Sequence, residues 1–493
     1  MTSLSLNFPK VAAAIVTYNH RVPVLKLIAS LEQQNIPTFV TENNGADGAA
    51  EAIRKQFPQV SLLESPANLG GCGGFNCAAL AALSSGCEHL IFIDDDAFPE
   101  ADCIAQLTDF LDTHPEYIFA APSIYISSQP DTLQEAGGGV NFNRTNPVEA
   151  WYRFQVNPDL PPILDIDYAS ACCLMVRADA LRTMGVLDWA YFIFSDDVDL
   201  CLRLRKTFHK KGACLTNAKA FHDFPWAKPF APMRLYFFQR NGLRLIANHR
   251  AKGELKSLFI ALMRLSRRIF YSALVGDVEI KQTLVCAFKD AWQGKFGNWD
   301  SWITFAKNRT QLNAHFFKQH AVKRILIDIS IEDFEADILR SLKTLHSSAT
   351  VDILCDEHRA SSHQDNPSYT QVFTRKVGFI KPLCILPRLL QQKYDLVITD
   401  ATMEARRPSA MCGKQAAIFH NDALYLAASH PYIAAVAHLI SLPIGLLAAS
   451  FTLHHFRKPF PAGTPPTEAG ELLKTIGINP EVGQPYARLK PDD

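Results

Sequence analysis

The sequence predicts an α/β protein in which a helical segment joins two α/β units. Apolar, β-branched runs alternate with segments of helical spacing from Val11 to Ile93, and a similar alternation begins near Val322. Between them, from Pro232 to about Phe296, basic and apolar residues alternate at helical spacing. Strands that alternate with helices in this way form a mainly parallel sheet, whose ligands gather at the carboxyl ends of the strands.

Length and composition indicate the number of domains and argue against some kinds of partner and compartment. The chain has 493 residues, more than one hydrophobic core usually organises, so we expect at least two domains. Lysine plus arginine equals aspartate plus glutamate at 49 each, so no overall charge favours a nucleic-acid partner, and any anion site must be local. The cysteines lack zinc spacing and are typical of a reducing compartment. Pro9 and Lys10 interrupt the first apolar run, so we expect no signal peptide and a cytoplasmic location.

The first unit has a regular pattern followed by an irregular one. Strands are expected at Val11–Val16, Thr38–Thr41, Val60–Leu63 and His89–Ile93, and helices at Val22–Gln33, Ala49–Phe57 and Ala78–Ser84. The segment from Phe119 to Asp167 is rich in Pro, Gly and Asn, which predicts loops and short strands over one edge of the sheet. An acceptor-binding lid is one interpretation of that segment.

The second half divides into a helical extension, a smaller Rossmann-like domain and a tail. The predicted boundaries are 1–231 for the first α/β domain, 232–320 for a pair of helices with a basic face, 321–460 for the second α/β domain and 461–493 for a polar tail. In the second domain, strands are expected at Arg324–Ile329, Thr350–Cys355 and Tyr394–Thr399, and a helix at Glu332–Leu345. This domain has no GxGxxG motif and no P-loop, so no motif indicates that it binds a nucleotide.

The segment from Tyr432 to Leu453 is almost free of charge and long enough to cross a bilayer. It also contains His438, Pro443 and Gly445, which are uncommon in a simple span. A buried core helix, a helix that lies on or re-enters a membrane, and a true span are the three interpretations.

Three adjacent carboxylates, Asp94, Asp95 and Asp96, end the apolar strand Leu90–Ile93. Adjacent carboxylates repel one another unless a cation or hydrogen-bond donors offset the charge. Mg²⁺ and Mn²⁺ prefer hard oxygen ligands and bind through one or two carboxylates together with substrate phosphates. The pattern therefore favours a metal site over an exposed acidic turn.

A second acidic group, Asp196, Asp197 and Asp199, begins a predicted helix after an aromatic run. One aspartate would suffice to cap a helix, so at least one of the three is free to act as a general base for an incoming hydroxyl. Two weaker signals accompany it. The glycine-rich stretch Asn68–Asn76 predicts a loop that can bring backbone N–H groups close to an anion, and His222 is either a structural histidine or a metal ligand.

These segments occur in a specific order along the chain: Ile15–Asn19, Glu42–Gly45, Asn68–Gly71, Asp94–Asp96, Ser195–Asp199 and His222. In that order they resemble the motif series of family 2 glycosyltransferases with the GT-A fold, which are Rossmann-like nucleotide-diphospho-sugar transferases. The glycine-rich loop and the full Asp-Asp-Asp look most like the branch that contains galactofuranosyltransferases and rhamnosyltransferases. The six motifs span about 220 residues. Beyond about residue 300 the resemblance stops.

The resemblance implies a role for each matching residue. It implies that Asp197 is the catalytic base, preceded by Asp196. Mn²⁺ or Mg²⁺ would be held by Asp94, Asp96 and His222. The donor-binding residues that it implies are Thr17, Asn19, Glu42, Asn68, Gly70, Asp94 and Asp95. The family usually has Asp where this chain has Glu42.

The expected function is metal-dependent, inverting transfer of a sugar, galactofuranose or rhamnose, from a nucleotide-diphosphate donor to a glycan or lipid-linked acceptor at the cell surface. The basic helices resemble those by which such enzymes approach anionic membranes, so peripheral contact with the inner face of the membrane is expected as an alternative to a solvated basic face. A nucleotidyltransferase is a rival hypothesis, although Asn68–Asn76 lacks the basic residue that it would need. A catalytically silent sugar-binding or scaffolding subunit is the other.

Overall fold

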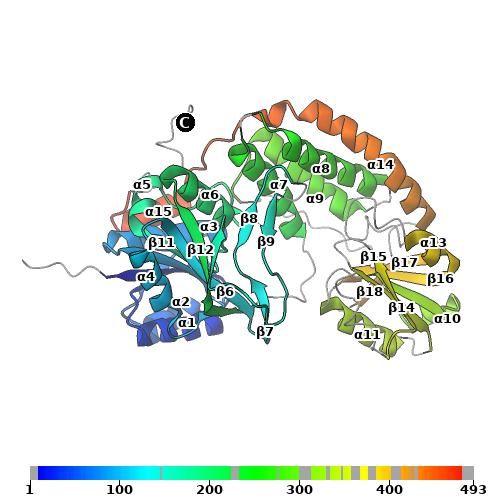
Figure 1. Cartoon of the computed structure of the whole chain (residues 1–493), viewed down its shortest axis with the longest axis horizontal. Coiled ribbons are helices and arrows are strands. Elements are labelled where there is room, and N and C mark those ends of the chain that lie inside the picture. The colour runs from blue at the N-terminus through cyan, green and yellow to red at the C-terminus, as the bar shows by residue number, and fades with distance from the viewer. Residues whose placement is uncertain are drawn as a thin grey trace, which may run out of the picture.

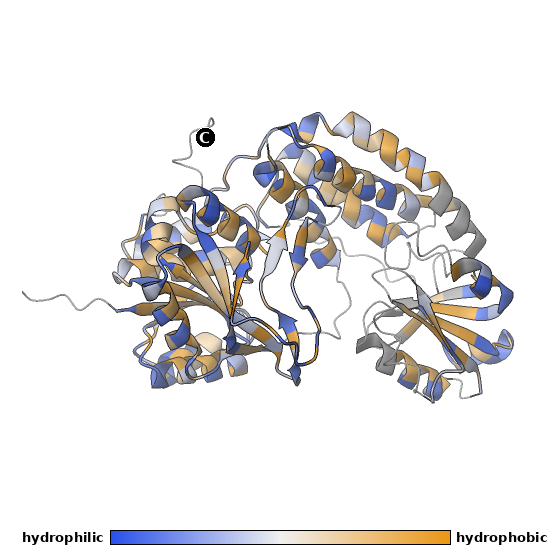
Figure 2. Cartoon of the chain, viewed as in Figure 1, coloured by the Kyte–Doolittle hydropathy of each residue, from blue (hydrophilic) through white to orange (hydrophobic). Residues whose placement is uncertain are grey.

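The computed structural model describes residues 9–144, 147–223, 232–251, 253–274, 277–298, 312–328, 333–345, 348–356, 367–375, 385–400, 412–420, 423–426 and 431–479. Two sheets lie at opposite ends of the molecule, and an arch of helices connects them (Figure 1). Hydrophobic residues run along the strands of both sheets (Figure 2). The predicted α/β fold is therefore confirmed.

The amino-terminal sheet is built around four parallel strands at the positions that the sequence predicts. They are β1 (Val11–Thr17), β2 (Thr38–Glu42), β3 (Ser61–Glu64) and β4 (His89–Asp94), in the order β4-β1-β2-β3. The register pairs Thr17 with Glu42 and Val16 with Asp94. Residues that follow these strands therefore meet at one edge of the sheet, as the carboxyl ends of parallel strands do.

Helices cover both faces of this sheet, which is why its strands are apolar throughout. One face packs against α1 (Arg21–Gln33), α2 (Ala49–Gln56) and α4 (Cys103–Thr113). The other packs against α3 (Gly70–Ser84), α5 (Ala178–Met184) and α6 (Asp196–Phe208).

The glycine-rich stretch is shorter as a loop than predicted, because α3 begins at Gly70. The reason is packing. A Cβ on Gly74 would lie 2.2 Å from Cγ2 of Val16 on β1, so glycine lets the first turns of α3 lie directly on the strand. Only Asn68 and Leu69 remain as the loop that precedes the helix.

The sheet continues beyond β4 with strands that the sequence did not predict. Its order is β10-β12-β6-β11-β4, with β10 (Ile163–Ile166), β12 (Lys211–His222), β6 (Tyr117–Ile126) and β11 (Cys173–Arg177). The prediction of loops and short strands is wrong for β6, a fully buried strand in the middle of the sheet. Pro122 obscured it, because proline lacks the N–H that a central strand normally donates. In the structure Pro122 lies opposite Leu215, where the register of β12 shifts.

Shorter strands pair with the far ends of β12 and β6 or with each other. Strand β5 (Ala97–Pro99) pairs with the end of β12, and β7 (Gln129–Glu135) pairs with β6. Strands β8 (Gly138–Val140) and β9 (Val148–Ala150) pair with each other. This part of the predicted irregular segment does consist of short strands.

The segment expected to be a pair of helices forms three in the described residues. They are α7 (Pro232–His249), α8 (Lys256–Leu274) and α9 (Val278–Gln293). The predicted basic face is wrong for α7, because Arg240 and Arg244 are fully buried. Arg244 pairs with the buried Asp188, and Arg240 donates to backbone carbonyls. Both arginines therefore bind the catalytic domain from inside rather than facing solvent.

The second sheet has the doubly wound order β15-β14-β13-β16-β17-β18. Its strands are β13 (Arg324–Asp328), β14 (Thr350–Asp356), β15 (Gln371–Arg375), β16 (Tyr394–Asp400), β17 (Gly413–His420) and the antiparallel β18 (Ala423–Leu426). The three predicted strands and the helix, which is α11 (Asp333–Leu345), are confirmed. Ile329 and Glu332, at two of the predicted boundaries, lie outside the described residues. Helices α10 (Ala314–Gln319) and α13 (Leu386–Gln391) flank this sheet.

The apolar stretch forms α14 (Pro431–Thr452), which lies along α8 (Figure 1). Gly445 faces α8 so closely that a Cβ would be 2.7 Å from Cβ of Arg267. Among the helices of the described residues, none combines the length and the apolar character that a membrane span requires.

After α14 the chain returns to the catalytic domain through a short 3₁₀ turn (His455–Arg457) and then forms α15 (Thr467–Thr475). Ala469 and Leu473 of α15 are buried in the same core as α3. The backbone N–H of Gly463 donates to Oδ1 of Asp188 at 2.7 Å. A segment within the predicted polar tail is thus part of the packing of the catalytic domain.

Gly463→Ala is expected to lower the free energy of unfolding by about 1–3 kcal/mol. A Cβ on Gly463 would lie 2.2 Å from the backbone nitrogen of Ala190, which has no room to move away. Gly242→Ala in α7 is the matched control, because nothing lies within 4 Å of its added Cβ and alanine favours a helix. Denaturant unfolding measures both. Equal stability of the two variants would contradict this packing.

Candidate active site

Two carboxylates and one imidazole meet at the end of β4. Ligand atoms of Asp94, Asp96 and His222 all lie within 4.8 Å of one another. His222 reaches this place because the end of β12 pairs with β5, which places it opposite Ala97. Its Nε2 lies 3.1 Å from Oδ1 of Asp96. The three residues named from the sequence as metal ligands are therefore brought together by the fold.

The electrostatics of this group suit a cation. Burial, together with the neighbouring charges of Asp96, Asp95 and Asp197, raises the pKa of Asp94 to about 7, against the opposing effect of His222. A divalent ion would offset this crowded negative charge, and two carboxylates with one imidazole suit Mn²⁺ or Mg²⁺. The residues present thus fit such an ion.

Gln134 on β7 supports His222 from the other side and was missed in the sequence. Its Oε1 lies 2.9 Å from Nδ1 of His222. When Nδ1 donates to this oxygen, the lone pair of neutral His222 is on Nε2, which faces Asp94 and Asp96. The two residues are 88 positions apart and share no motif spacing, so no sequence signal connected them.

Gln134→Leu is expected to weaken Mn²⁺ binding about 10- to 100-fold, because the ring of His222 loses the acceptor that fixes its orientation. Titration calorimetry with Mn²⁺ in the presence of a nucleoside diphosphate measures the effect. Gln129→Leu, at an exposed position of the same strand, is the control and should bind like the unchanged chain. If the two variants bind Mn²⁺ equally, Gln134 does not orient the ligand.

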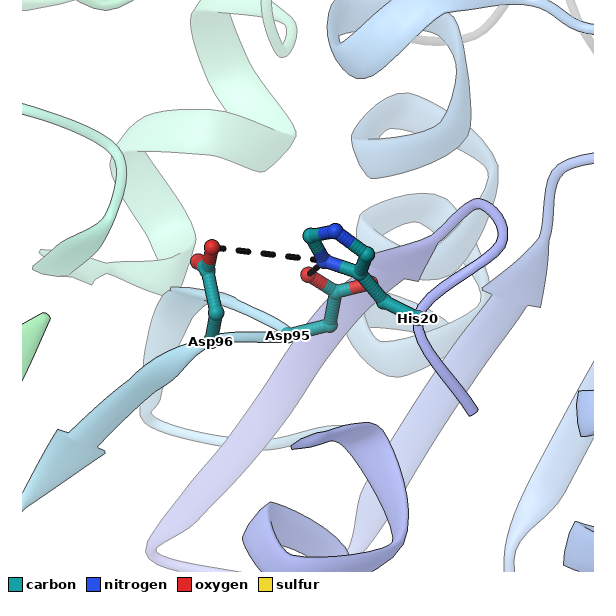
Figure 3. A group of neighbouring side chains, drawn as sticks. All are labelled: His20, Asp95 and Asp96. Atoms are coloured by element: carbon teal, nitrogen blue, oxygen red, sulfur yellow. Dashed lines mark hydrogen bonds and ion pairs between the residues drawn. The ribbon is translucent and has the colours of Figure 1, made fainter. Parts of the chain in front are cut away.

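His20 is a second residue that the sequence did not single out, although it directly follows Asn19. Its Nδ1 lies 3.0 Å from Oδ1 of Asp95 and 4.0 Å from Oδ2 of Asp96 (Figure 3). Burial raises the pKa of Asp95, and the hydrogen bond from His20 opposes that rise. Asp95 therefore contacts the loop after β1, and ligand atoms of His20, Asp95 and Asp96 also lie within 4.8 Å of one another.

The predicted donor residues lie along the neighbouring strand ends, and several already hold the loops there. Oδ1 of Asn19 accepts from the N–H of Ala46 at 2.7 Å, and Oε1 of Glu42 accepts from that of Gly45 at 2.6 Å. Oδ1 of Asn68 accepts from the N–H of Gly70 at 2.8 Å.

Asn43 connects these loops, and Thr17 lies below them. Nδ2 of Asn43 donates to Oδ1 of Asn68 at 3.2 Å, and its Oδ1 accepts from the N–H of Leu69 at 2.8 Å. Thr17 is buried at the end of β1. The fold thus gathers all the predicted donor residues at one edge of the sheet.

The three aspartates at the start of α6 do not all have the same role. Asp199 is buried, and its carboxylate is hydrogen-bonded to Nε of Arg203 and Nε2 of His249, each at 2.7 Å. Although burial opposes it, these two partners hold the pKa of Asp199 well below its usual range. Asp199 is therefore a structural anion, which leaves Asp196 and Asp197 at the helix start.

Asp197, the second residue of α6, is bound at the helix start by two backbone N–H groups. Its Oδ1 accepts from the N–H of Val198 at 2.7 Å, and its Oδ2 accepts from that of Ala171 at 3.4 Å. Burial raises the pKa of Asp197, and its charge in turn raises the pKa of Asp94. The carboxylates of Asp197 and Asp94 are thus close enough for their charges to interact.

Glu135 adds a carboxylate that sequence reasoning missed. Burial and the charge of Asp197 raise its pKa to about 7, and among the described residues its buried Oε1 has no hydrogen-bond partner. Glu135 follows Gln134 on β7. This short strand therefore supplies one side chain that contacts His222 and one whose charge interacts with that of Asp197.

Comparison with known proteins identifies this domain. Residues 13–185 match the sequence model described as "Glycosyl transferase family 2". This part of the chain is a family 2 glycosyltransferase domain. The glycosyltransferase domain also resembles galactofuranosyltransferase GlfT1 of Mycolicibacterium smegmatis, with 26% identity over 211 residues, which cover 42% of this chain and 68% of the relative.

Another relative carries the name N-acetylglucosaminyl-diphospho-decaprenol L-rhamnosyltransferase and comes from Mycobacterium tuberculosis. It is 27% identical over 217 residues, which cover 39% of this chain and 69% of the relative. The predicted membership of the family, the GT-A fold and the assignment as a transferase enzyme are therefore confirmed. The match favours glycosyl transfer over nucleotidyl transfer.

Two solved structures match part of the chain at low sequence identity. Residues 1–349 of S. aureus TarS in complex with UDP-GlcNAc match with 15% identity and a TM-score of 0.36, over 58% of this chain and 81% of that one. GalNAc-T7 with UDP, GalNAc and Mn²⁺ matches with 11% identity and a TM-score of 0.35, over 51% of this chain and 54% of that one.

Proposed function

We propose that the chain is an inverting, metal-dependent glycosyltransferase that uses a nucleotide-diphosphate sugar. The observation that supports this most is the position of Asp197 beside the group formed by Asp94, Asp96 and His222. A divalent ion held by these three residues would neutralise the charge that develops on the diphosphate. Asp197 would then deprotonate the acceptor hydroxyl while the ion offsets the charge on the leaving diphosphate.

In this proposal the protein supplies one base for one displacement. The carboxylate of Asp197 takes the proton of the acceptor hydroxyl, and the hydroxyl oxygen attacks the anomeric carbon. The bond from that carbon to the diphosphate oxygen breaks with its electron pair, and the configuration inverts. Asp196 assists from the same helix start.

The donor pocket follows the strand ends. We assign Thr17, Asn19 and Glu42 to the nucleoside, and Asn68 with Gly70 to the ribose and diphosphate. Asp95 contacts the donor beside Asp94. Galactofuranose and rhamnose are the sugars favoured by the names of the relatives, and a glycan or lipid-linked acceptor is favoured by the same names.

We propose to keep the division 1–231, 232–320, 321–460 and 461–493 with two changes that the packing supports. Helix α14 lies on α8 of the helical extension, so it belongs with that extension rather than with the second sheet. Helix α15 packs in the core of the catalytic domain, so residues 461–479 belong there.

The experiment that tests the function measures donor turnover. Purified chain with Mn²⁺ is incubated with a panel of nucleotide sugars that includes UDP-galactofuranose and dTDP-rhamnose, and release of nucleoside diphosphate is followed. We expect release from one donor, dependent on an acceptor and lost on chelation. Absence of binding and release with every donor, even with a cell-envelope extract as acceptor, would instead support a silent sugar-binding or scaffolding subunit.

We further propose that α14 contacts the cytoplasmic face of an anionic membrane. Its inward positions are small: Ala437, Ser441, Gly445 and Ala449 recur every four residues and are buried. In the second half of α14, Leu447 and Phe451 face outward, 61% and 76% exposed, while Leu442 packs against the core of the helical arch. This arrangement is the reverse of a helix that buries its apolar face in a protein core.

Charge at the end of α14 favours a lipid surface as the partner. Arg457 and Lys458 are exposed at the end of the 3₁₀ turn that follows α14, and α14 itself contains no Asp, Glu, Lys or Arg. A long apolar stripe followed by cations suits insertion among acyl chains beside anionic headgroups. Helix α14 lies on the outer side of the helical arch (Figure 1).

The double variant Leu447→Glu and Phe451→Glu is expected to lose at least about tenfold in affinity for vesicles with anionic lipid, because charged residues resist burial in the acyl region. Co-sedimentation at low salt measures binding. Val156→Glu is the control, since Val156 is 66% exposed but lies on the catalytic domain. Binding that is unchanged in the double variant would rule out α14 as the contact.

A further inference from the structure

The loop that leads into α6 is held in an unfavourable backbone conformation. Phe192, Phe194 and Ser195 have φ angles of 64°, 67° and 68°, in the left-handed region that non-glycine residues rarely adopt. Such residues cost energy and persist only where the surrounding structure fixes them. The next two residues are Asp196 and Asp197, so the conformation of this loop sets where the helix and its carboxylates begin.

Asn241 on α7 holds this loop through its backbone. Its Nδ2 donates to the carbonyl oxygens of Tyr191, Ile193 and Phe194 at 3.0, 2.8 and 3.0 Å. The opposite side of the amide is fixed as well, because Oδ1 accepts from Nε of Arg240 at 3.0 Å. The reversed amide would bring Oδ1 against three carbonyl oxygens, so only one orientation is compatible with these neighbours.

The rest of α7 reinforces the same loop. Nη2 of Arg240 donates to the carbonyl of Ala190 at 3.3 Å. The ring of Phe192 stacks on Phe237 with centroids 5.2 Å apart. The ring of Phe194 stacks on Phe238 of the same helix at 4.5 Å. The loop is thus bound to α7 by its carbonyls and by its side chains.

We infer that Asn241 is a positioning residue for catalysis, which acts by holding the loop that places Asp197. This inference rests on the proposed function, in which Asp197 is the base. It also makes α7, which lies outside residues 13–185 of the family match, part of the catalytic apparatus. A base must face its proton within hydrogen-bond distance, and a displacement of about 1 Å costs on the order of 100-fold in rate.

The test compares isosteric variants on one helix. Asn241→Asp keeps the shape but replaces the donor with an oxygen that the three carbonyls repel. Asn241→Ala removes the hydrogen-bond donor Nδ2 without adding a charge. It replaces the first variant in the comparison if Asn241→Asp folds poorly. Asn248→Asp is the matched control: the side chain of Asn248, on the same helix, bonds to the backbone of Phe460 and not to the loop.

We expect kcat for sugar transfer to fall about 100-fold in both Asn241 variants, with the Kd for the donor and for Mn²⁺ unchanged and the Tm close to that of the Asn248→Asp control. A kcat equal to that of the control overturns the inference. So does a parallel loss of kcat, donor binding and Tm, since that pattern shows only destabilisation. An unchanged chain that transfers no sugar rejects the proposed function itself before the variants are compared.

Discussion

Asp197→Asn is expected to lower kcat by about a thousandfold while donor and Mn²⁺ binding persist. The amide keeps the size of the side chain. Only its one remaining oxygen can accept from the backbone N–H groups of Val198 and Ala171. It cannot take a proton from the acceptor hydroxyl at neutral pH. Steady-state transfer kinetics give kcat, and equilibrium titration of the donor gives the binding constant.

Asp196→Asn is the control that separates the base from a general effect of charge. Both substitutions remove one negative charge from the first turn of α6, so a loss due only to the helix start should be similar in the two variants. A thousandfold loss in Asp197→Asn with a much smaller one in Asp196→Asn identifies the base. The opposite order would transfer the role to Asp196, and near-normal turnover in both would refute base catalysis from α6.

Asp96→Asn and removal of metal are expected to have the second largest effect. Asp96 contacts His222 at 3.1 Å and lies within reach of Asp94, so its charge is central to the proposed ion site. We expect affinity for Mn²⁺ to fall by at least about 100-fold, and transfer to stop on chelation and return when Mn²⁺ is restored. Titration calorimetry and turnover assays measure these two effects.

Asp112→Asn is the matched control, because it alters a similar group at the opposite end of β4. Asp112 lies 2.9 Å from Nε2 of His89, and Glu88 completes the group. There the cation is already present, since Nζ of Lys10 lies 3.0 Å from Asp112. Mn²⁺ binding should therefore be unaffected by Asp112→Asn. Transfer that survives both chelation and Asp96→Asn would mean that the enzyme works without metal.

The amino-terminal α/β pattern could be predicted because each strand and helix there follows one simple periodicity. The apolar run Leu90–Ile93 and the acidic residues after it are local features, and a strand buried between helices must be apolar. Their meeting with Thr17 and Glu42 follows from parallel pairing alone. Sequence order therefore sufficed for the sheet edge where the site lies.

Other features required partners that are distant in sequence. The strand β6 contains Pro122, which argues against a central strand until the irregular register of β12 opposite it is known. Arg240 and Arg244 have the spacing of a solvated basic face, and only the buried Asp188 and the loop carbonyls explain why they are inside. Helical spacing identifies a face but does not tell what covers it.

The sequence by itself determined the α/β class, the family and the residues that bear charge at the site, because those depend on local runs and on motif order. The tertiary structure alone decided which side chains orient them: Gln134 behind His222, His20 beside Asp95, and Asn241 beneath the loop before Asp197. Each of these contacts joins elements far apart in the chain. Hydrogen-bond geometry of that kind is fixed by packing, and no periodicity in the sequence encodes it.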